Sequence, residues 1–243
     1  MEFEEANPDR VRAEWDRPVL VSFSGIDGAG KTTQIENLTN WLNQAGIKVH
    51  IVRFWDDVAL LRELREWIGH KLFKGDKGTG TPESPVARRD KNVSKWYMAT
   101  LRLFLCGLDA VGLKIVIARL RLQRTADVVI FDRYLYDQIA NLNLETRRAR
   151  FMVRAVLRLI PRPAVPCLLD ADPVLARSRK PEYPIEFLQW NRESYLRLAE
   201  MAGIKVIPAG SAEDVTGSVR RTVLSEMSRA QARSIEILPV SKP

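Results

Sequence analysis

Long hydrophobic runs are missing from this sequence of 243 residues. Its longest apolar segment, residues 97–122, is interrupted by charged residues that include Arg102, Asp109, Lys114 and Arg119. A transmembrane helix needs about 20 consecutive, mainly apolar residues. The first ten residues, MEFEEANPDR, are acidic and contain no apolar core, unlike a secretory signal. We therefore expect a cytoplasmic protein that does not span a membrane.

Cysteine and histidine are scarce, with two residues of each. Cys106 and Cys167 both lie in apolar stretches, which indicates buried thiols. His50 and His70 have no cluster of further ligands at zinc-site spacing around them, and this argues against a zinc site.

What the sequence does contain is the composition of an ordinary globular domain, with 46% hydrophobic residues and a net charge of +8. A chain of this length suits one α/β domain with a substantial core. The positive charge suggests anionic partners, either nucleotide phosphates or nucleic acid.

The most informative stretch is VLVSFSGIDGAGKTT, residues 19–33. It reads as a buried strand, a glycine-rich turn matching G-x-x-x-x-G-K-[ST], and the start of a helix, which is the context that a phosphate-binding loop requires. Such a loop wraps its N–H groups around an anion, while the lysine reaches the phosphates and the following hydroxyl binds Mg²⁺. The predicted phosphate-binding residues are Gly25, Gly28, Ala29, Gly30, Lys31, Thr32 and Thr33.

Along the chain, predicted strands alternate with predicted helices. The expected strands are residues 19–24, 47–54, 128–131, 165–169 and 205–208. One expected helix follows Thr33. The others cover residues 58–73, 94–124 (with a possible bend near Gly107 or Gly112), 136–160, a segment that starts at Asp172-Pro173, 185–202 and 212–233. This alternation predicts a parallel sheet with helices on both faces.

Four segments fall outside this pattern. Residues 1–17 form a polar N-terminal extension and 234–243 an extended tail, which leaves 18–233 as the domain. Residues 75–92 form a long loop rich in glycine and proline, either functional or disordered without ligand. Residues 177–184 form a short basic loop between two helices.

A second site element follows the strand at 128–131. Asp132 stands at the strand end where a carboxylate can hold Mg²⁺ directly or through water, and Arg133 projects into the same crevice. A helix-entry aspartate beside a surface arginine is the alternative. Asp170 and Asp172 look like a metal pair, but helix capping is the favoured interpretation of Asp172, since Pro173 follows it.

Four motifs together resemble the thymidylate kinase family of nucleoside monophosphate kinases over about residues 18–225. They are FSGIDGAGKTTQ at 23–34, DRYLYDQIA at 132–140, LDADP at 169–173, and the basic loop RSRKPEYP at 177–184. The helix after that loop carries the family's spacing of Phe187, Arg192, Tyr195, Leu198 and Ala199.

The resemblance implies a P-loop NTPase three-layer sandwich, with a five-stranded parallel sheet and a short lid at 177–184. It also implies transfer of the γ-phosphoryl group of ATP, with Mg²⁺, to dTMP or a related nucleoside monophosphate. A homodimer formed through long apolar helices such as 94–124 is a further implication.

Residue roles follow from the same resemblance. Lys31 and the loop amides would hold the donor phosphates, and Mg²⁺ would sit on Thr32 and Asp132. Asp27 would help to position the acceptor. Arg133 would bridge toward the transferred group, and the lid would close over it with three cations, Arg177, Arg179 and Lys180.

The acceptor side departs from the family pattern. Ser24 replaces a glutamate before the loop, and Asp137 replaces a serine after D-R-Y. The stretch VRFWDDV keeps only Arg53 of the family's T-R-E-P-G-G-T. Leu108-Asp109-Ala110 lacks the arginine of A-D-R, for which Arg102 is a possible substitute. The donor half matches and the acceptor half does not, so specificity for thymidylate stays open.

Two features have both a bland and a functional interpretation. Trp55, Trp96 and Tyr136 either stack on a base or pack in the fold. Six arginines fall within residues 147–162 without an acidic residue: Arg147, Arg148, Arg150, Arg154, Arg158 and Arg162. This basic stripe is either a solvated helix face or a patch for nucleic acid or an acidic partner.

Two alternatives to a nucleotide kinase therefore remain. The first is a P-loop kinase of another acceptor, such as a deoxynucleoside or a non-nucleotide metabolite. The second is an ATPase or switch that binds nucleic acid through the basic stripe.

Overall fold

The computed structural model describes residues 17–58, 96–142, 144 and 146–236. The predicted loop at 75–92 lies outside these ranges. So do residues 59–73 of the predicted helix at 58–73, residues 1–16 of the predicted N-terminal extension and residues 237–243 of the predicted tail. Among the described residues no helix is long and apolar enough to cross a membrane. The cytoplasmic location stays a prediction.

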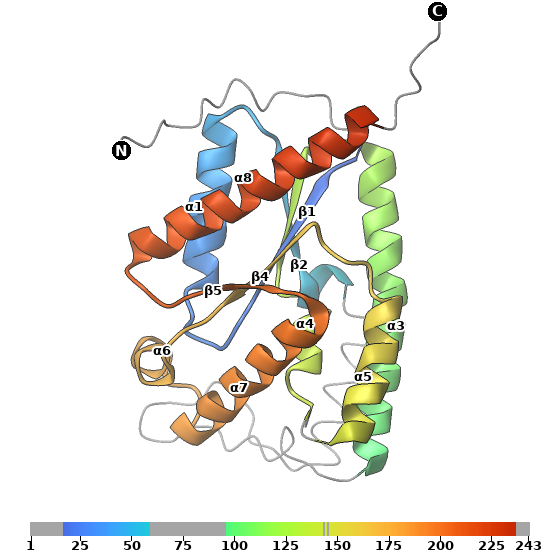
Figure 1. The fold of residues 1–243 in the computed structure, drawn as a ribbon, viewed down its shortest axis with the longest axis vertical. Helices are drawn as coiled ribbons and strands as arrows, with labels where there is room; N and C mark the ends of the chain where they lie inside the picture. The colour runs from blue at the N-terminus through green and yellow to red at the C-terminus, as the bar shows by residue number, and fades with distance from the viewer. Residues whose placement is uncertain (1–16, 59–95, 143, 145, 237–243) are drawn as a thin grey trace, which may run out of the picture.

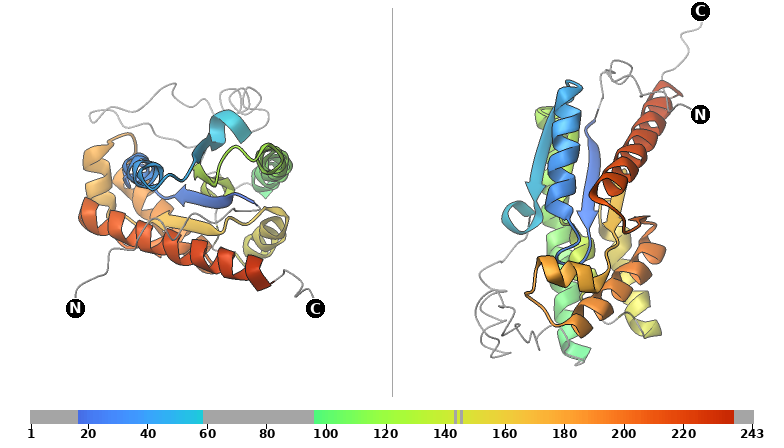
Figure 2. Two further views of the ribbon diagram at one scale, coloured as in Figure 1. Left: turned by 90° about the horizontal axis from the view of Figure 1, so that it is seen from above. Right: turned by 90° about the vertical axis from the view of Figure 1, so that its left-hand side faces the viewer.

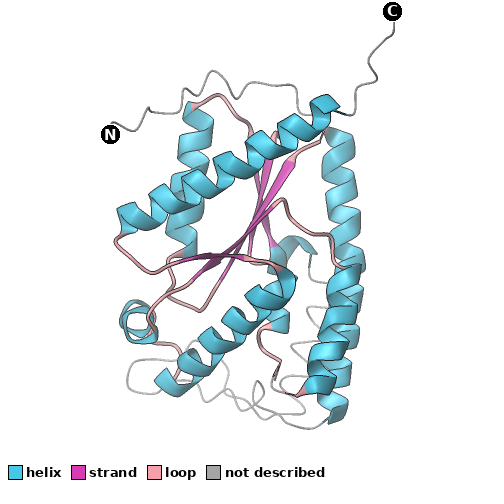
Figure 3. Ribbon diagram, viewed as in Figure 1, coloured by secondary structure: helices cyan, strands magenta, loops and turns pink. Residues whose placement is uncertain are grey.

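A five-stranded parallel sheet forms the centre of the molecule, as predicted. Its order is β2-β3-β1-β4-β5, and the strands are β1 (Val19–Ser24), β2 (Val49–Arg53), β3 (Val128–Asp132), β4 (Val165–Leu169) and β5 (Lys205–Ile207). The helices surround the strands in Figure 3.

Every residue of β1 and β4 is buried, as expected for strands of a parallel sheet that is covered on both faces. β1 lies between β3 and β4, with Phe23 in register with Asp132. The residues that follow β1 and β3 therefore emerge side by side at the carboxyl edge of the sheet, where open α/β sheets bind their ligands.

The two faces of the sheet carry separate hydrophobic cores. One core packs under α1 (Lys31–Gln44) and α8 (Ala212–Glu236), and the other under α3 (Trp96–Gln123), α4 (Leu135–Ile139), α5 (Arg147–Leu159) and α7 (Ile185–Ala202). Figures 1 and 2 show α1 on one side of the strands and the α3–α5 pair on the other. The three-layer sandwich is confirmed.

The predicted single helix at 136–160 is wrong, because the structure divides it into α4 and α5. The Asn141 side chain donates a hydrogen bond to the Asp137 carbonyl near the end of α4, and the Thr146 hydroxyl caps the start of α5 by accepting from Ala149 N–H. Leu142 and Leu144 are buried between the two helices, so the apolar pattern continues through the break and concealed it.

Three smaller differences concern helix ends. α3 is one continuous helix of 28 residues through Gly107 and Gly112. α8 extends to Glu236, into the predicted tail. Helix α6 (Pro173–Arg179) includes Arg177 and Arg179, so the loop before α7 is shorter than the predicted basic loop at 177–184.

Candidate active site

The phosphate loop lies between β1 and α1, and its glycines are required by geometry. Gly28 has φ +85°, and a Cβ atom there would lie 2.2 Å from the Ala176 carbonyl oxygen of α6. At Gly25 a Cβ would lie 2.6 Å from the Leu169 carbonyl oxygen of β4. Both positions combine a positive φ with close backbone approach, which only glycine accommodates.

Lys31 is the first residue of α1, and its side chain is buried inside the loop. Its Nζ donates hydrogen bonds to the carbonyl oxygens of Gly25 (2.8 Å) and Ile26 (2.9 Å). Burial, and then the charge of Arg133, lower the pKa of Lys31 to about 8. Gly30 gives α1 no side-chain cap, so the first-turn N–H groups face the same point as the ammonium group.

Asp27, in the loop, is the meeting point of three cations. Arg133 Nη2 lies 2.5 Å and Lys180 Nζ 4.0 Å from Asp27 Oδ1. Burial alone would raise the pKa of the Asp27 carboxyl, but the charges of Arg133 and Lys31 outweigh it and hold that pKa well below its usual range. The structure thus brings together the predicted residues Asp27, Lys31, Arg133 and Lys180.

Arg133 reaches this position through an unusual backbone conformation, with φ +69° in a residue that is not glycine. Its N–H donates to the Phe23 carbonyl of β1 at 3.1 Å, and its Nη1 lies 3.7 Å from Asp137 Oδ1. Positive φ in such a residue costs energy and is frequent at functional sites. The guanidinium group is therefore held between two carboxylates.

Asp137 is a buried centre that the sequence reasoning did not assemble. Its carboxylate accepts hydrogen bonds from the Ser24 hydroxyl (2.7 Å), the Tyr134 N–H (3.0 Å) and the Tyr195 hydroxyl (2.8 Å). In the sequence, Ser24 and Asp137 are two separate departures from the family pattern. Their simultaneous occurrence was the signal that they form a pair.

Thr32 and Asp132 are the predicted metal ligands. Thr32 is exposed at the start of α1, and Asp132 is half-buried at the end of β3. Within the part of the chain that the structure describes, no hydrogen bond occupies either side chain, and no group of three or more His, Cys, Asp or Glu residues is placed to hold a metal. One hydroxyl and one carboxylate suit Mg²⁺, which keeps several waters and binds through phosphates.

The segment that precedes the predicted lid is tied to neighbouring elements by helix capping and by an ion pair. The Asp172 side chain accepts from the N–H groups of Val174 (2.9 Å) and Leu175 (3.0 Å), which confirms the capping interpretation. Asp170 instead binds the Arg192 guanidinium through two hydrogen bonds, at 2.6 and 2.7 Å. These two aspartates therefore have structural partners and do not form a metal pair.

Arg177 and Arg179 occupy the last turn of α6, where Arg177 is half-buried and Arg179 exposed. Ala176, which touches Gly28, directly precedes Arg177. The backbone of α6 thus lies close to the phosphate loop just before these two arginines, and neither arginine has an ion-pair partner among the described residues.

The predicted acceptor residues are more scattered. Arg53 ends β2 and Trp55 lies in the π-helical turn η2 (Phe54–Val58), and both are exposed. Arg102 and Trp96 lie on α3, with side chains outside the described part of the structure. Tyr136 is buried and lines a pocket with residues of α5 and α7.

Asp109, at the position where the family has A-D-R, is fully buried on α3 and accepts a hydrogen bond of 2.6 Å from the Gln138 side chain of α4. This contact fastens α4 to α3. Asp109 of this chain is therefore paired with Gln138 in the contact between the two helices.

No protein-family model matches the chain, but curated proteins do. The chain is 28% identical over 202 residues to a probable thymidylate kinase of Methanosphaera stadtmanae, covering 81% of this chain and 92% of that protein. It is 24% identical over 214 residues to a probable thymidylate kinase of Archaeoglobus fulgidus, covering 85% and 95%.

A third relative is the thymidylate kinase of Bifidobacterium longum strain DJO10A, which is 31% identical over 167 residues, covering 66% of this chain and 70% of that protein. The five-stranded parallel sheet with helices on both faces is consistent with the fold of thymidylate kinases. The chain therefore belongs to the thymidylate kinase family.

Proposed function

We propose that the protein transfers the γ-phosphoryl group of ATP to a nucleoside monophosphate, with dTMP as its acceptor. The observation that carries the proposal is the convergence of Lys31, Arg133 and Lys180 around Asp27 at the carboxyl edge of the sheet. Phosphoryl transfer needs little covalent chemistry and depends on positioned positive charge. The relatives named thymidylate kinase support dTMP as the acceptor.

The donor phosphates would bind in the loop. Lys31 then exchanges its hydrogen bonds to the Gly25 and Ile26 carbonyls for phosphate oxygens, and the first-turn N–H groups of α1 contribute further donors. Thr32 and Asp132 would hold Mg²⁺, which supplies charge neutralisation between the donor phosphates when bound. Both side chains fit that role, because a hydroxyl and a carboxylate supply the oxygen ligands that Mg²⁺ prefers.

The transferred group would be stabilised by Arg133 and by the lid. Asp27 and Asp137 hold the Arg133 guanidinium from two sides, so its orientation is fixed before substrates arrive and costs little reorganisation. Arg177, Arg179 and Lys180 would add charge from the lid and exclude water when it closes.

The acceptor would lie between the phosphate loop and the exposed pair Arg53 and Trp55. Arg53 offers a guanidinium for the acceptor phosphate, and Trp55 a ring face for a base. Arg102 is proposed as a further acceptor residue from the sequence alone.

A homodimer is part of the proposal. On α3, four apolar side chains spaced on one helix face are exposed: Phe104, Val111, Ile115 and Leu122. An exposed apolar stripe of this kind marks an interaction surface, and a second copy of α3 would cover it in an isologous contact.

The experiment is a product assay with ATP, Mg²⁺ and each nucleoside monophosphate in turn, with Lys31→Ala as the control for turnover at this site. We expect stoichiometric ADP and dTDP from dTMP. Turnover with another monophosphate would correct the acceptor. ATP hydrolysis that needs DNA or RNA instead, with a steep salt dependence, would replace the kinase by an ATPase.

A further inference from the structure

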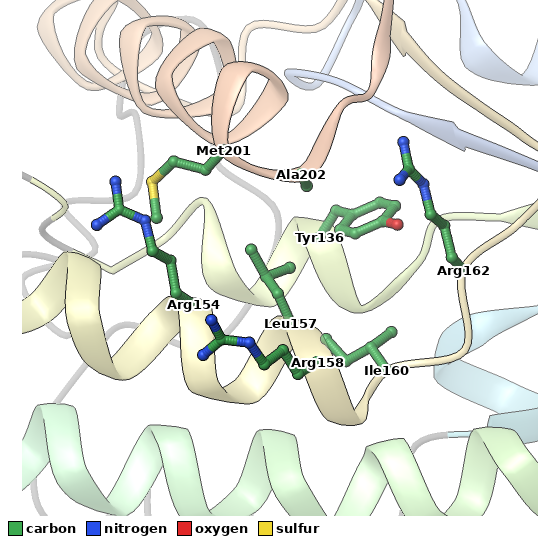
Figure 4. A pocket seen from close by; sticks show the side chains of 8 residues that line it. All are labelled: Tyr136, Arg154, Leu157, Arg158, Ile160, Arg162, Met201 and Ala202. Atoms are coloured by element: carbon green, nitrogen blue, oxygen red, sulfur yellow. The ribbon is translucent and has the colours of Figure 1, made fainter.

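A basic pocket of about 290 Å³ lies between α5 and the end of α7. Figure 4 shows its lining: Tyr136, Arg154, Leu157, Arg158, Ile160, Arg162, Met201 and Ala202. Apart from Tyr136, none of these residues belongs to the proposed donor or acceptor groups. Its volume is at the lower end of the range for small-molecule pockets, about 300 Å³ and above.

The charge around this pocket is uncompensated. Three guanidinium groups line it and no acidic side chain does. Within the described part of the chain, Arg154 and Arg158 have no ion-pair partner. Three like charges around one cavity repel one another, and an anion between them would relieve that repulsion.

One of the three arginines is held in place without a ligand. Arg162 Nη2 donates to the Gly203 carbonyl at 3.2 Å, and a Cβ at Gly203 would lie 2.5 Å from the same nitrogen. Gly203 has φ +65° and ends α7. The guanidinium therefore lies against the end of α7 and is partly ordered by this hydrogen bond, which lowers the entropy cost of binding an anion.

The remainder of the lining is apolar or aromatic. Leu157, Ile160, Met201 and Ala202 supply alkyl and thioether surface. Burial raises the pKa of Tyr136 to about 12, so its hydroxyl stays protonated and can donate a hydrogen bond. In Figure 4 this hydroxyl points toward Arg162.

We propose that this α5–α7 pocket binds a small phosphate ester with an apolar or aromatic body. The ester's phosphate would lie beside Arg154 and Arg158, whose guanidinium groups form charge-assisted, often bidentate hydrogen bonds, while Arg162 lies at the other end of the pocket, beyond Tyr136 (Figure 4). Its apolar body would lie against Leu157 and Met201. The site is separate from the phosphate loop and does not depend on the proposed kinase activity.

The same arginines on an extended surface would suggest nucleic acid. The pocket favours a small ligand, because the guanidinium groups surround one cavity and its aromatic ring, Tyr136, is 3% exposed. Single-strand binding relies instead on accessible rings on which successive bases stack. The test must therefore distinguish binding of a small ligand from binding of nucleic acid.

The test titrates the full-length protein with phenyl phosphate and follows ¹³C-methyl methionine NMR signals. The chain has five methionines. Met201 lines the pocket, whereas Met227 is buried in the opposite core under α8. We expect the Met201 signal to shift to saturation and the Met227 signal to stay unchanged.

Two double variants remove the same charge from the same helix. Arg154→Gln with Arg158→Gln should weaken the titration of Met201 at least about tenfold. Arg147→Gln with Arg148→Gln, outside the pocket lining, should change it less than about twofold. All four arginines are exposed, so folding is preserved, which thermal unfolding checks.

Three results would overturn the proposal. One is an unmoved Met201 signal at about 20 mM phenyl phosphate, weaker than any useful site. Another is a Met201 shift of equal size with phenol, which would show that the pocket binds the aromatic ring and does not recognise the phosphate. The third is binding of a decathymidylate strand, weakened equally by both double variants, without any response to phenyl phosphate.

Discussion

The Ser24 hydroxyl donates a 2.7 Å hydrogen bond to the Asp137 carboxylate, joining the end of β1 to α4 across 113 residues of sequence. Both side chains are buried. In the family pattern the strand end carries a carboxylate and the helix a hydroxyl. Here the two kinds of group have changed places, and the two departures from the family pattern form one contact between the end of β1 and α4.

Removing the carboxylate should be costly. Asp137→Ala leaves Ser24, Tyr195 and Arg133 without their buried acceptor, and we expect a loss of about 2–4 kcal/mol of unfolding free energy. Ser24→Ala should cost about 1 kcal/mol, because Asp137 keeps its other donors. Urea unfolding followed by circular dichroism measures both.

A double variant tests whether the residues at positions 24 and 137 act as a pair. A double variant, Ser24→Glu with Asp137→Ser, restores the family arrangement and should be more stable than the sum of its single changes predicts. Strict additivity in this double-mutant cycle would show that the two positions are independent.

Binding of ATP should depend on pH through Lys31, whose pKa is lowered to about 8 in the ligand-free protein. Phosphate oxygens favour the protonated ammonium and raise this pKa again, so binding takes up a proton above pH 8. Affinity is therefore full well below pH 8 and falls about tenfold between about pH 7 and pH 9. Calorimetry with Mg²⁺ chelated measures it.

Lys31→Arg provides the matched control for this titration. Arginine stays charged over the whole range, so ATP affinity of the variant should be lower but flat with pH. An equally steep pH dependence in this variant would assign the effect to another group.

Replacing Arg133 even by lysine should lower activity. Its two carboxylate partners and its positive φ orient a planar fork that a lysine cannot reproduce. We expect Arg133→Lys to lower kcat about 10²-fold or more with a smaller change in the KM for ATP. Arg124→Lys is the control, because Arg124 also has positive φ but is exposed far from the loop.

The α3 stripe predicts the oligomeric state. Val111→Glu with Ile115→Glu places two charges in the exposed apolar face and should convert a dimer into monomers, measured by sedimentation. Lys114→Glu changes the net charge equally on the same helix but beside the stripe, and should leave the dimer intact. A wild-type monomer at about 100 μM would contradict the assignment.

The sequence was sufficient where chemistry is encoded locally. The phosphate loop, the aspartate at the end of β3 and the Asp172 cap each occupy a few consecutive residues whose backbone requirements are specific. The break between α4 and α5 was missed, because Leu142 and Leu144 continue the apolar pattern while Thr146 starts a new helix.

Contacts between distant segments could not be predicted from the sequence, for a different reason. The pairing of Ser24 with Asp137 depends on the order of strands in the sheet, which local patterns do not contain. Similarly, helix periodicity placed Arg154 and Arg158 on one face, but only the packing of α7 shows that this face borders a cavity.

The contact of Gly28 with the Ala176 carbonyl has a mechanical consequence. A loop that approaches another backbone so closely leaves no space for sliding, so the phosphate loop and the first part of α6 move as one body. If the predicted lid closes, its hinge would therefore lie after Ala176. Ala176 itself would stay fixed to the phosphate loop, and the residues that follow it, from Arg177 onward, would be the part that moves.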